Sequence, residues 1–443
     1  MTEPAAPNYK ATLNLPKTAF DMKANLTQRE PAMLKAWQEA DGGGLYQQIR
    51  ARRHPKGKWV LHDGPPYANG DIHIGHLINK VLKDIVVKFR TMQGHDAPYV
   101  PGWDCHGLPI ESAIQKELGP KFRELSKDEV RQKCRDYAMK YVKLQSDSFQ
   151  RLGILGEFRN PYLTLNPAYE SGILEVLAEL VQRDLVYRQK KPVHWCTNDR
   201  TALAEAELEY ENRKDTSIYV RLKATKPLVQ LEGSPVPGKM ASSADPIDLI
   251  IWTTTPWTLP ANRAIAANEN HQYGYWRYLE GGQTKYAIIA EELGSRVFNT
   301  AGIEVFELLW SDSGQSLAGM EYHHPLDPSR VQPLVLADYV TLEDGTGLVH
   351  TAPGHGKEDY QTGLKYGLEI YNPVLPDGRY DDSVPDFLKG KTIWDANQLV
   401  IDKLKELGTL FHAQQFDHEY PHCWRCKKPV IFRATEQWFV RAS

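Results

Sequence analysis

Residues 62–76 constrain the fold more than any other stretch, because this polar loop, HDGPPYANGDIHIGH, lies between a predicted strand and a predicted helix. The strand is predicted over Lys58–Leu61, where the segment ends in an apolar run. The helix is predicted from apolar residues at three- and four-residue spacing, which we expect to form one buried face: Ile74, Leu77, Ile78, Val81, Leu82, Ile85, Val86 and Phe89. Helix N-termini attract anions, and open α/β sheets bind ligands at this edge. The loop therefore predicts a phosphate site that contains His73 and His76.

Three longer stretches narrow this prediction. They are GPPYANGDIHIGH at 64–76, PYVPGWDCHGLPIE at 98–111 and IWTTTPWTLPANRAI at 251–265. In this order they resemble the isoleucine-specific members of the class I aminoacyl-tRNA synthetases, enzymes that activate an amino acid with ATP and load it onto tRNA. A lone HxxH pattern would be weak evidence, because two solvated histidines often stand at a helix start.

Length and composition limit the number of domains and the class of protein. The 443 residues can hold two to four domains, and 41% hydrophobic with 25% charged residues is typical of a soluble globular protein. The net charge of −3 gives no overall attraction for nucleic acid, so any tRNA contact must come from local patches. The N-terminus lacks an apolar signal region, and no stretch reaches the roughly 18 apolar residues of a membrane helix. We therefore expect a cytoplasmic protein without membrane contact.

The pattern along the chain predicts an α/β fold, in which the first half of a Rossmann-type domain is interrupted by a β-rich, barrel-like editing insertion. A short strand is expected at Pro98–Val100, and apolar strands such as Ile218–Leu222, Asp248–Trp252 and Leu334–Val340 mark the insertion. The predicted segments are an N-terminal helical extension (1–57), the first Rossmann half (58–160), a connecting segment (161–215), the editing domain (216–417), and a cysteine neck that returns to the catalytic domain (418–443).

Parts of the resembled family are missing from these 443 residues. The sequence contains no KMSKS-like loop, no helical anticodon-binding region and no second Rossmann half. The chain therefore looks like the N-terminal half of a synthetase, and we expect the isolated fragment to have lost amino acid activation.

The resemblance also implies an activation site. In this reaction the amino acid carboxylate attacks the α-phosphate of ATP, so hydrogen-bond donors must meet the charge on the phosphoryl oxygens. His73 and His76 would be the catalytic donors, and ATP with Mg²⁺ would be the substrate. By resemblance, ATP would contact Asn69, His73, Gly75 and His76, and the amino acid would contact Gly64, Pro65 and Asp104.

Residues 104–106 admit other roles. Asp104 would pair with the substrate ammonium, and the alternative is that it caps a helix over Leu108–Leu118. Cys105 and His106 suggest a thiol–histidine pair. We reject that pair, because adjacent side chains seldom face each other and no third orienting group is evident.

A second site is expected in the insertion. A hydrophobic pocket separates ligands that differ by one methylene by only about 1–3 kcal/mol, a figure already known for isoleucine against valine. Hydrolytic editing of mischarged valyl-tRNA would supply the missing selectivity. By resemblance, threonine hydroxyls would hold the ester and its water, His350 would limit the pocket to valine-sized side chains, and Asp359 would bind the ammonium. The predicted editing residues are Thr253, Thr254, Thr255, Asn262, His350 and Asp359, and no general base is assigned.

Two cysteine segments suggest a metal site. Cys423 and Cys426 form a CxxC pair, and the segment Cys196–Asp199 carries an aspartate where some family members have a second cysteine. A mixed cysteine and carboxylate site binds zinc more weakly than four thiolates do. The sequence leaves two alternatives open: a zinc held by Cys196, Asp199, Cys423 and Cys426, or a metal-free neck packed by Trp195 and Trp424.

Three functional hypotheses follow. The first is a fragment of an isoleucine-tRNA ligase, with isoleucine, ATP and tRNA(Ile) as partners, expected to be a monomer. The second is a free-standing editing hydrolase, because the insertion alone looks complete. The third, a non-catalytic tRNA-binding protein, is disfavoured by the intact residues His73, Gly75, His76 and Asp104.

Overall fold

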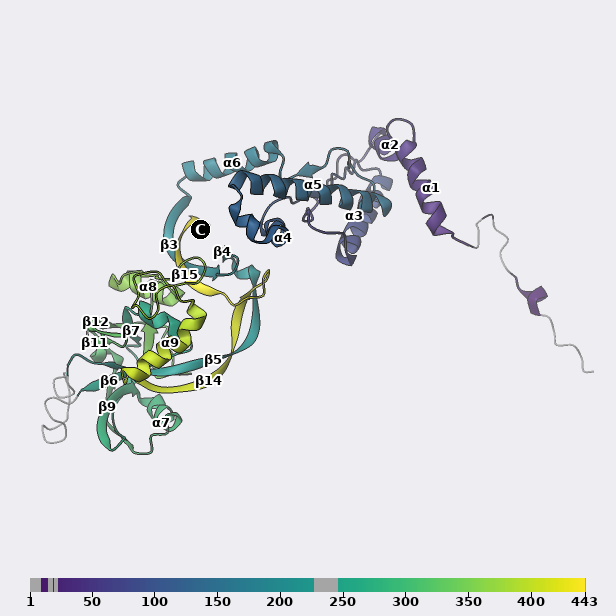
Figure 1. Ribbon diagram of the computed structural model, residues 1–443. Helices are drawn as coiled ribbons and strands as arrows, with labels where there is room; N and C mark the ends of the chain where they lie inside the picture. Colours follow the sequence, from purple (N-terminus) through teal and green to yellow (C-terminus); the bar gives the residue numbers. More distant parts are fainter. Residues whose placement is uncertain (1–8, 15–18, 20–22, 227–245, 443) are drawn as a thin grey trace, which may run out of the picture. The chain divides into compact units, whose positions relative to one another are not determined.

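The computed structural model describes residues 9–14, 19, 23–226 and 246–442 (Figure 1). Parts of the predicted N-terminal extension and editing insertion, residues 1–8, 15–18, 20–22 and 227–245, lie outside this description, as does residue 443. The chain divides into two compact units, Met1–Gln182 (unit 1) and Arg183–Ser443 (unit 2). The finer division into five segments stays a prediction.

Unit 1 is mainly helical. Helices lie within the predicted N-terminal extension, from the end of the 62–76 loop onward and in the charged segment that follows. Ser126 and Glu129 begin the longest of these helices with reciprocal side-chain to backbone bonds, which satisfy otherwise unpaired N–H groups. The helices are α1 (Leu26–Glu39), α2 (Leu45–Ala51), α3 (Ile74–Met92), α4 (Leu108–Leu118), α5 (Lys127–Arg151) and α6 (Pro167–Gln182).

Sheet structure in the described part of unit 1 is limited to short parallel pairings. Strand β1 (Gly102–Trp103) pairs in parallel with β2 (Tyr162–Leu163). Isolated parallel bridges join Lys58 to Asp96 and Tyr67 to Asp104. The predicted strands at 58–61 and 98–100 are therefore wrong as regular strands, although the parallel direction is the one that a doubly wound sheet requires. The prolines within 65–101 lack the N–H donors that a continuous ladder needs.

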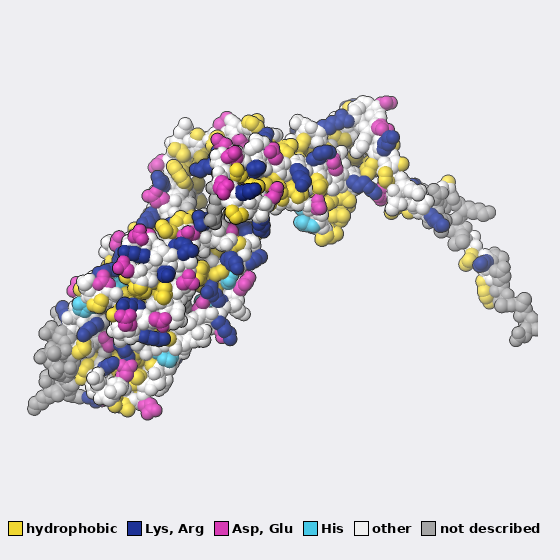
Figure 2. Space-filling view, in the orientation of Figure 1, with side chains coloured by type: hydrophobic (Ala, Val, Ile, Leu, Met, Phe, Trp, Pro, Cys, Tyr) yellow, Lys and Arg dark blue, Asp and Glu magenta, His cyan; other side chains and the backbone are white. Residues whose placement is uncertain are grey.

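The prediction that α3 buries its apolar stripe is also wrong for the described residues. Ile74 is 70% exposed and Leu82 is 58% exposed, and Figure 2 shows hydrophobic side chains at the surface around this helix. The buried positions are instead Lys80, Asp84 and Val87. The spacing correctly predicts an amphipathic helix, but it does not specify which face packs within unit 1.

Unit 2 is built around a 10-stranded mixed sheet. Its apolar core includes Ile218, Ile250 and Ile288, each of which is fully buried. Strand β6 lies at the centre, because it pairs antiparallel with β5 and in parallel with β9 and β13. The strands of this sheet are β5 (Leu208–Lys223), β6 (Ile247–Thr253), β7 (Ala264–Ala267), β8 (Gln272–Glu280), β9 (Gln283–Ala290), β10 (Phe306–Ser313), β11 (Glu321–His324), β12 (Asp327–Leu336), β13 (Val349–Thr351) and β14 (Leu410–Cys423).

The described strands form an open path that ends at β10 and β11, so no closed barrel is seen among them. One isolated bridge, between Ala224 and Tyr322, links β11 to the end of β5. Helices α7 (Glu291–Thr300), α8 (Lys357–Tyr366) and α9 (Ile393–Glu406) complete the unit. Among the helices described in the two units, none has both the length and the apolar character needed to cross a membrane.

Unit 2 also contains two long antiparallel strand pairs, one in the large sheet and one in a separate small sheet. Strands β5 and β14 run side by side from Val220 opposite Leu410 to Leu208 opposite Cys423 (Figure 1). A separate three-stranded sheet has the order β15-β3-β4, with β3 at Val186–Cys196, β4 at Thr201–Leu203 and β15 at Ile431–Val440. Residues 432–440, which we expected to return to a Rossmann sheet, therefore pair with β3.

Candidate functional site

A cavity of about 370 Å³ in unit 2 brings together most of the predicted editing residues. Its walls include Thr253 at the end of β6, His350 on β13 and Asp359 in the first turn of α8, residues separated by up to 106 positions in the sequence. Thr253 Oγ1 accepts a hydrogen bond from the Thr255 backbone N–H at 3.0 Å. This bond turns the chain as the strand ends, so that Thr254 and Thr255 also line the cavity.

His350 is held between two neighbours. Its Nε2 lies 2.9 Å from Thr258 Oγ1, and its Nδ1 lies 2.9 Å from Asn262 Nδ2. Burial lowers the pKa of His350 to about 3, so the ring is neutral at physiological pH. Asn262 is fully buried and is not among the cavity-lining residues. The predicted residue Asn262 therefore lies behind the cavity wall and contacts the cavity through His350.

Asp359 supplies a carboxylate to the same cavity. Its Oδ2 accepts a hydrogen bond from the Ala352 backbone N–H at 2.8 Å. Burial raises the pKa of Asp359 to about 6, although the bond from Ala352 opposes the shift. A positive charge in the cavity would stabilise the ionised form, so this carboxylate is suited to bind an ammonium group.

The cavity also contains residues that the sequence analysis did not assign. Tyr339, Thr346 and His355 line it. His355 Nδ1 bonds to the Phe432 carbonyl oxygen at 3.0 Å, and burial lowers its pKa to about 4. Thr346 and His355 lie in the stretch GTGLVHTAPGHGKEDY at residues 345–360, which also contains His350 and Asp359, so proximity in sequence could have found them. Tyr339 had no such signal.

In unit 1, the two histidines of the 62–76 loop begin helix α3. His73 Nδ1 accepts from the Gly75 N–H at 3.1 Å, and His76 Nδ1 accepts from the His73 N–H at 3.2 Å. The ring centroids are 4.0 Å apart. Burial lowers the pKa of His76, with further contributions from His73 and Lys80. Because Nδ1 accepts a backbone hydrogen bond in both rings, the Nε2–H group of each ring is the one that can donate to an anion.

The other predicted activation residues lie along the same loop and beside it. A side chain at Gly75 would place its Cβ 2.9 Å from the His73 ring, so glycine keeps this histidine pair intact. Asn69 Oδ1 accepts from the Tyr137 hydroxyl at 2.8 Å. Backbone bonds between Asp104 and the 66–68 segment place Asp104 next to the loop that contains Gly64 and Pro65.

The alternative role of Asp104 as a helix cap is not what the structure shows. Helix α4 has Gly107 at its N-cap, without a side-chain cap bond. Asp104 Oδ1 instead accepts from the His106 backbone N–H at 3.3 Å. Asp104 is only partly buried, so its carboxylate remains accessible to a ligand.

Buried ion pairs connect the 62–76 loop to helix α3. Lys80 Nζ lies 2.5 Å from Asp63 Oδ2, and Lys83 Nζ lies 2.6 Å from Asp63 Oδ1. The Asp63 side chain is 0% exposed and that of Lys80 is 2% exposed. This contact joins the start of the 62–76 loop to the inward face of α3. The apolar spacing of the helix does not report this contact, because both partners are charged.

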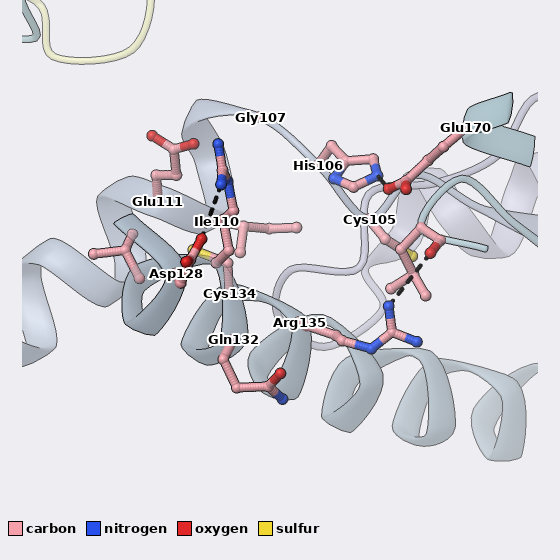
Figure 3. A pocket seen from close by; sticks show the side chains of 13 residues that line it. Cys105, His106, Gly107, Ile110, Glu111, Asp128, Gln132, Cys134, Arg135 and Glu170 are labelled. Carbon is pink, nitrogen blue, oxygen red and sulfur yellow. Dashed lines mark hydrogen bonds and ion pairs between the residues drawn. The ribbon is translucent and has the colours of Figure 1, made fainter. Parts of the chain in front are cut away.

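A separate cavity of about 520 Å³ lies beside residues 105–107 (Figure 3). His106 faces Glu170 there, with Nε2 3.2 Å from the Glu170 carboxylate. Cys105 Sγ bonds to the Trp103 carbonyl oxygen at 3.6 Å, and burial raises the pKa of this thiol to about 11. These contacts agree with the rejection of a reactive Cys105–His106 pair. Asp104 is not among the residues that line this cavity.

The four predicted metal ligands converge at the end of the β3 and β14 strands. One ligand atom from each of Cys196, Asp199, Cys423 and Cys426 lies within 4.8 Å of the others. The Cys196 and Cys426 sulfurs are 3.4 Å apart. Tetrahedral zinc with bonds of about 2.3 Å separates its sulfur ligands by roughly 3.8 Å, so the arrangement fits zinc after a small adjustment.

The metal-free alternative receives less support from the packing. Trp195 is buried, and its Nε1 donates to the Pro376 carbonyl oxygen at 2.8 Å. Trp424 is 41% exposed, so the prediction that both tryptophans pack the neck is wrong for Trp424. His422 Nδ1 bonds to the Tyr420 carbonyl oxygen at 2.8 Å, and His422 does not join the cluster of four ligands.

Comparisons with known proteins show which family this chain resembles. The family model for class I tRNA synthetases (I, L, M and V) matches residues 32–443. Isoleucine–tRNA ligases of Persephonella marina and Thermotoga maritima are 48% and 49% identical to this chain over 98% of its length. The ligase of Nitratidesulfovibrio vulgaris strain Miyazaki F is 50% identical over the same share.

The chain spans 44% of the length of each of these three ligases. A solved Agrobacterium radiobacter K84 complex, LeuRS-tRNA-LeuAMS, is matched over 93% of this chain and 52% of that chain, at 17% identity. Its TM-score of 0.36 is too low for a comparison of folds. The family match covers the 62–76 loop and the unit 2 cavity, and the chain belongs to the class I tRNA synthetases of the isoleucine, leucine, methionine and valine group.

Proposed function

We propose that this chain is part of an isoleucine-tRNA ligase and that unit 2 hydrolyses valyl-tRNA(Ile) made in error. The observation that carries the proposal is the cavity that combines threonine hydroxyls, the neutral ring of His350 and the carboxylate of Asp359. An aminoacyl ester has a free ammonium group, a side chain of defined size and an ester that water must attack. The cavity offers one group suited to each of these three features.

In the proposed editing reaction, Asp359 binds the ammonium and thereby fixes the ester carbon in the cavity. The hydroxyls of Thr253 and Thr255 lie 3.2 Å apart and orient the ester and the attacking water. His350 occupies the space that the extra methylene of isoleucine would need. We assign no protein general base, and we propose that the terminal ribose hydroxyl of the tRNA assists the attack of water.

Unit 1 is proposed to be the first half of a Rossmann-type domain that takes part in activation. The Nε2–H groups of His73 and His76 would donate to phosphoryl oxygens of ATP, which enters with Mg²⁺. Asp104 would bind the ammonium of isoleucine beside Gly64 and Pro65. Supporting this role, both rings have Nδ1 engaged with the backbone, which leaves the donor on the outer nitrogen.

Further parts of the proposal concern metal, partners and location. We propose that Cys196, Asp199, Cys423 and Cys426 hold one zinc ion that closes the neck of the insertion, where zinc would act by fixing the strand ends. The proposed partners are tRNA(Ile), isoleucine and ATP, and the chain is proposed to act as a cytoplasmic monomer. The barrel-like form of the insertion is also a proposal, supported by the bridge between Ala224 and Tyr322.

A free-standing editing hydrolase is the second candidate, because the whole editing cavity lies within unit 2. Deacylation of valyl-tRNA(Ile) by this chain would fit both candidates. Restored isoleucine-dependent pyrophosphate exchange after addition of the remaining segment of a related ligase would favour the ligase.

Two substitutions test the proposed editing site. Asp359→Ala removes the counter-charge of the ammonium and should slow valyl-tRNA(Ile) deacylation by orders of magnitude. His350→Ala enlarges the cavity but keeps the ammonium contact, so it should permit hydrolysis of isoleucyl-tRNA(Ile). If Asp359→Ala works at the parent rate and His350→Ala still spares isoleucyl-tRNA(Ile), the site has been misplaced.

A further inference from the structure

A continuous chain of hydrogen bonds runs behind the editing cavity, from β11 to the turn after β6. The Tyr322 hydroxyl donates to Asn262 Oδ1 at 2.6 Å, and Asn262 Nδ2 reaches His350 Nδ1 at 2.9 Å. His350 Nε2 reaches Thr258 Oγ1 at 2.9 Å, and the Thr258 hydroxyl donates to the Thr255 carbonyl oxygen at 2.8 Å. The Tyr322, Asn262 and Thr258 side chains sit in the protein interior, and Tyr322 and Asn262 are 0% exposed.

The orientation of the Asn262 amide follows from its partners. Asn262 Nδ2 lies 2.9 Å from the Ala264 carbonyl oxygen, which can only accept a hydrogen bond. At the other end of the amide, Oδ1 receives the proton of the Tyr322 hydroxyl. Both contacts require the same orientation, with the NH₂ group toward His350. The amide therefore donates to His350 Nδ1 and has no lone pair to offer it.

The protonation of His350 follows in turn. Because Nδ1 accepts from Asn262, a neutral ring must carry its proton on Nε2 and donate it to Thr258 Oγ1. Thr258 can accept this bond, since its own proton is directed to the Thr255 carbonyl oxygen. The ring is neutral at physiological pH, because burial lowers the pKa of His350 to about 3. Every bond in the chain thus points in one direction, from Tyr322 toward Thr255.

We propose that Tyr322 is a positioning residue for editing: through Asn262 it fixes His350 as the Nε2–H tautomer, with both ring nitrogens engaged inside the protein. His350 then acts as a rigid, neutral wall that selects by size, and it is not the base that activates water. The inference rests on the proposed editing function for its effect on selectivity, but the tautomer follows from the hydrogen bonds alone.

This hydrogen-bond pattern determines which groups of the cavity can still bond to a substrate. His350 has no lone pair available, since Nδ1 accepts from Asn262 and Nε2 carries a proton. The Thr258 hydroxyl donates its proton to the Thr255 carbonyl oxygen and is therefore not free to donate to a substrate. The hydroxyls of Thr253 and Thr255 contact each other at 3.2 Å and line the cavity together with Thr254, so threonine hydroxyls remain to orient an ester and a water. A tilted or reversed His350 ring would alter both the shape of the wall and this donor pattern.

The test combines a direct measurement of the tautomer with an activity ratio. The full chain would be labelled with ¹⁵N-histidine, and the His350 signals would be identified by their loss in His350→Gln. Nitrogen shifts distinguish protonated from unprotonated ring nitrogens, and we expect Nε2 protonated and Nδ1 unprotonated. Deacylation of valyl-tRNA(Ile) and isoleucyl-tRNA(Ile) would be measured on the same preparations.

Tyr322→Phe removes only the first donor of the chain. We expect a shifted or mixed tautomer signal and a loss of valine-over-isoleucine selectivity of roughly 2- to 10-fold, the factor that one hydrogen bond represents. Asn262→Asp offers His350 only acceptors and should move the ring proton to Nδ1. Tyr278→Phe is the matched control, because Tyr278 is also buried in unit 2, at 1% exposed, and takes no part in this chain of bonds. It should change neither readout.

Two results would overturn the proposal: a parent spectrum with the proton on Nδ1, or a Tyr322→Phe variant with parental tautomer signals and selectivity. A folding defect is recognised by altered signals for all histidines, and Asn262→Asp then decides the tautomer question. Absence of any valyl-tRNA(Ile) deacylation by the parent chain would refute the proposed function. The histidine spectra of the parent and of the variants would still decide whether Tyr322 sets the tautomer.

Discussion

The Asp359 carboxyl group should make the stability of unit 2 depend on pH. Burial raises its pKa from 3.8 to about 6, so the folded state binds this proton more tightly than the unfolded state does. Between about pH 4 and pH 6 the folded state therefore holds more protons, and the free energy of unfolding falls as pH rises. A shift of about two pKa units corresponds to about 3 kcal/mol, and partial contact with solvent makes this an upper limit.

Asp359→Asn removes the charge and keeps an amide oxygen that can accept from the Ala352 N–H. We expect this variant to be more stable than the parent by roughly 1–3 kcal/mol at pH 8, with no difference below about pH 4. Its valyl-tRNA(Ile) deacylation should fall by orders of magnitude, because the ammonium loses its counter-charge. The ionised carboxylate of Asp359 would thus lower the stability of unit 2 while it serves to bind the substrate.

Urea unfolding at pH 4, 6 and 8 measures this effect. To assign an unfolding transition to unit 2, the same experiment would be run on a variant of unit 1, such as Asp63→Asn. The transition that this substitution leaves unchanged belongs to unit 2. Glu358→Gln is the comparison variant, since it removes a neighbouring carboxylate from the same helix turn at an exposed position. Because the charge of Glu358 also raises the pKa of Asp359, this variant should be stabilised at pH 8 by less than Asp359→Asn. Equal stabilities of Asp359→Asn and the parent at pH 4 and pH 8 would refute the reasoning.

Three further predictions concern other parts of the chain. Deacylation of valyl-tRNA(Ile) at subsaturating substrate should decrease as pH falls through about 6, because Asp359 becomes protonated in the free cavity; a flat rate down to pH 5 would contradict this. Asp63→Asn should destabilise unit 1 by roughly 3–5 kcal/mol, because it leaves Lys80 charged and buried; unchanged unfolding in urea would show that the pair is dispensable. Elemental analysis should find at most one zinc per chain, and Asp199→Cys should bind zinc more tightly in a chelator competition; equal affinities would argue against Asp199 as a ligand.

The unit 2 cavity shows what sequence motifs could predict. Thr253–Thr255, His350 and Asp359 were assigned to one editing site by resemblance, although up to 106 positions separate them, and the sheet brings them to one cavity. Motifs could not predict Tyr322 or Tyr339, because neither residue lies within the sequence stretches that carry the resemblance. Tyr322 acts through a contact with Asn262 across 60 residues, which depends on how β11 packs.

Unit 1 shows the limits of periodicity. The spacing in 74–89 predicted helix α3 closely, since its bounds are Ile74–Met92. It assigned the wrong face to the interior of unit 1, because Lys80 and Asp84 are buried through ion pairs and hydrogen bonds that an apolar pattern does not report. A single isolated bridge, between Lys58 and Asp96, replaces the predicted strand at 58–61, and residues 98–100 form no regular strand, because local propensity does not specify whether neighbouring segments complete a ladder.

The most direct test of the central claim is the rate at which the purified 443-residue chain hydrolyses valyl-tRNA(Ile), compared with isoleucyl-tRNA(Ile) under the same conditions. The account predicts rapid loss of valine and a much slower loss of isoleucine, because His350 leaves room for the smaller side chain only. Equal rates for the two substrates, or a valyl-tRNA(Ile) rate no faster than that without protein, would contradict it.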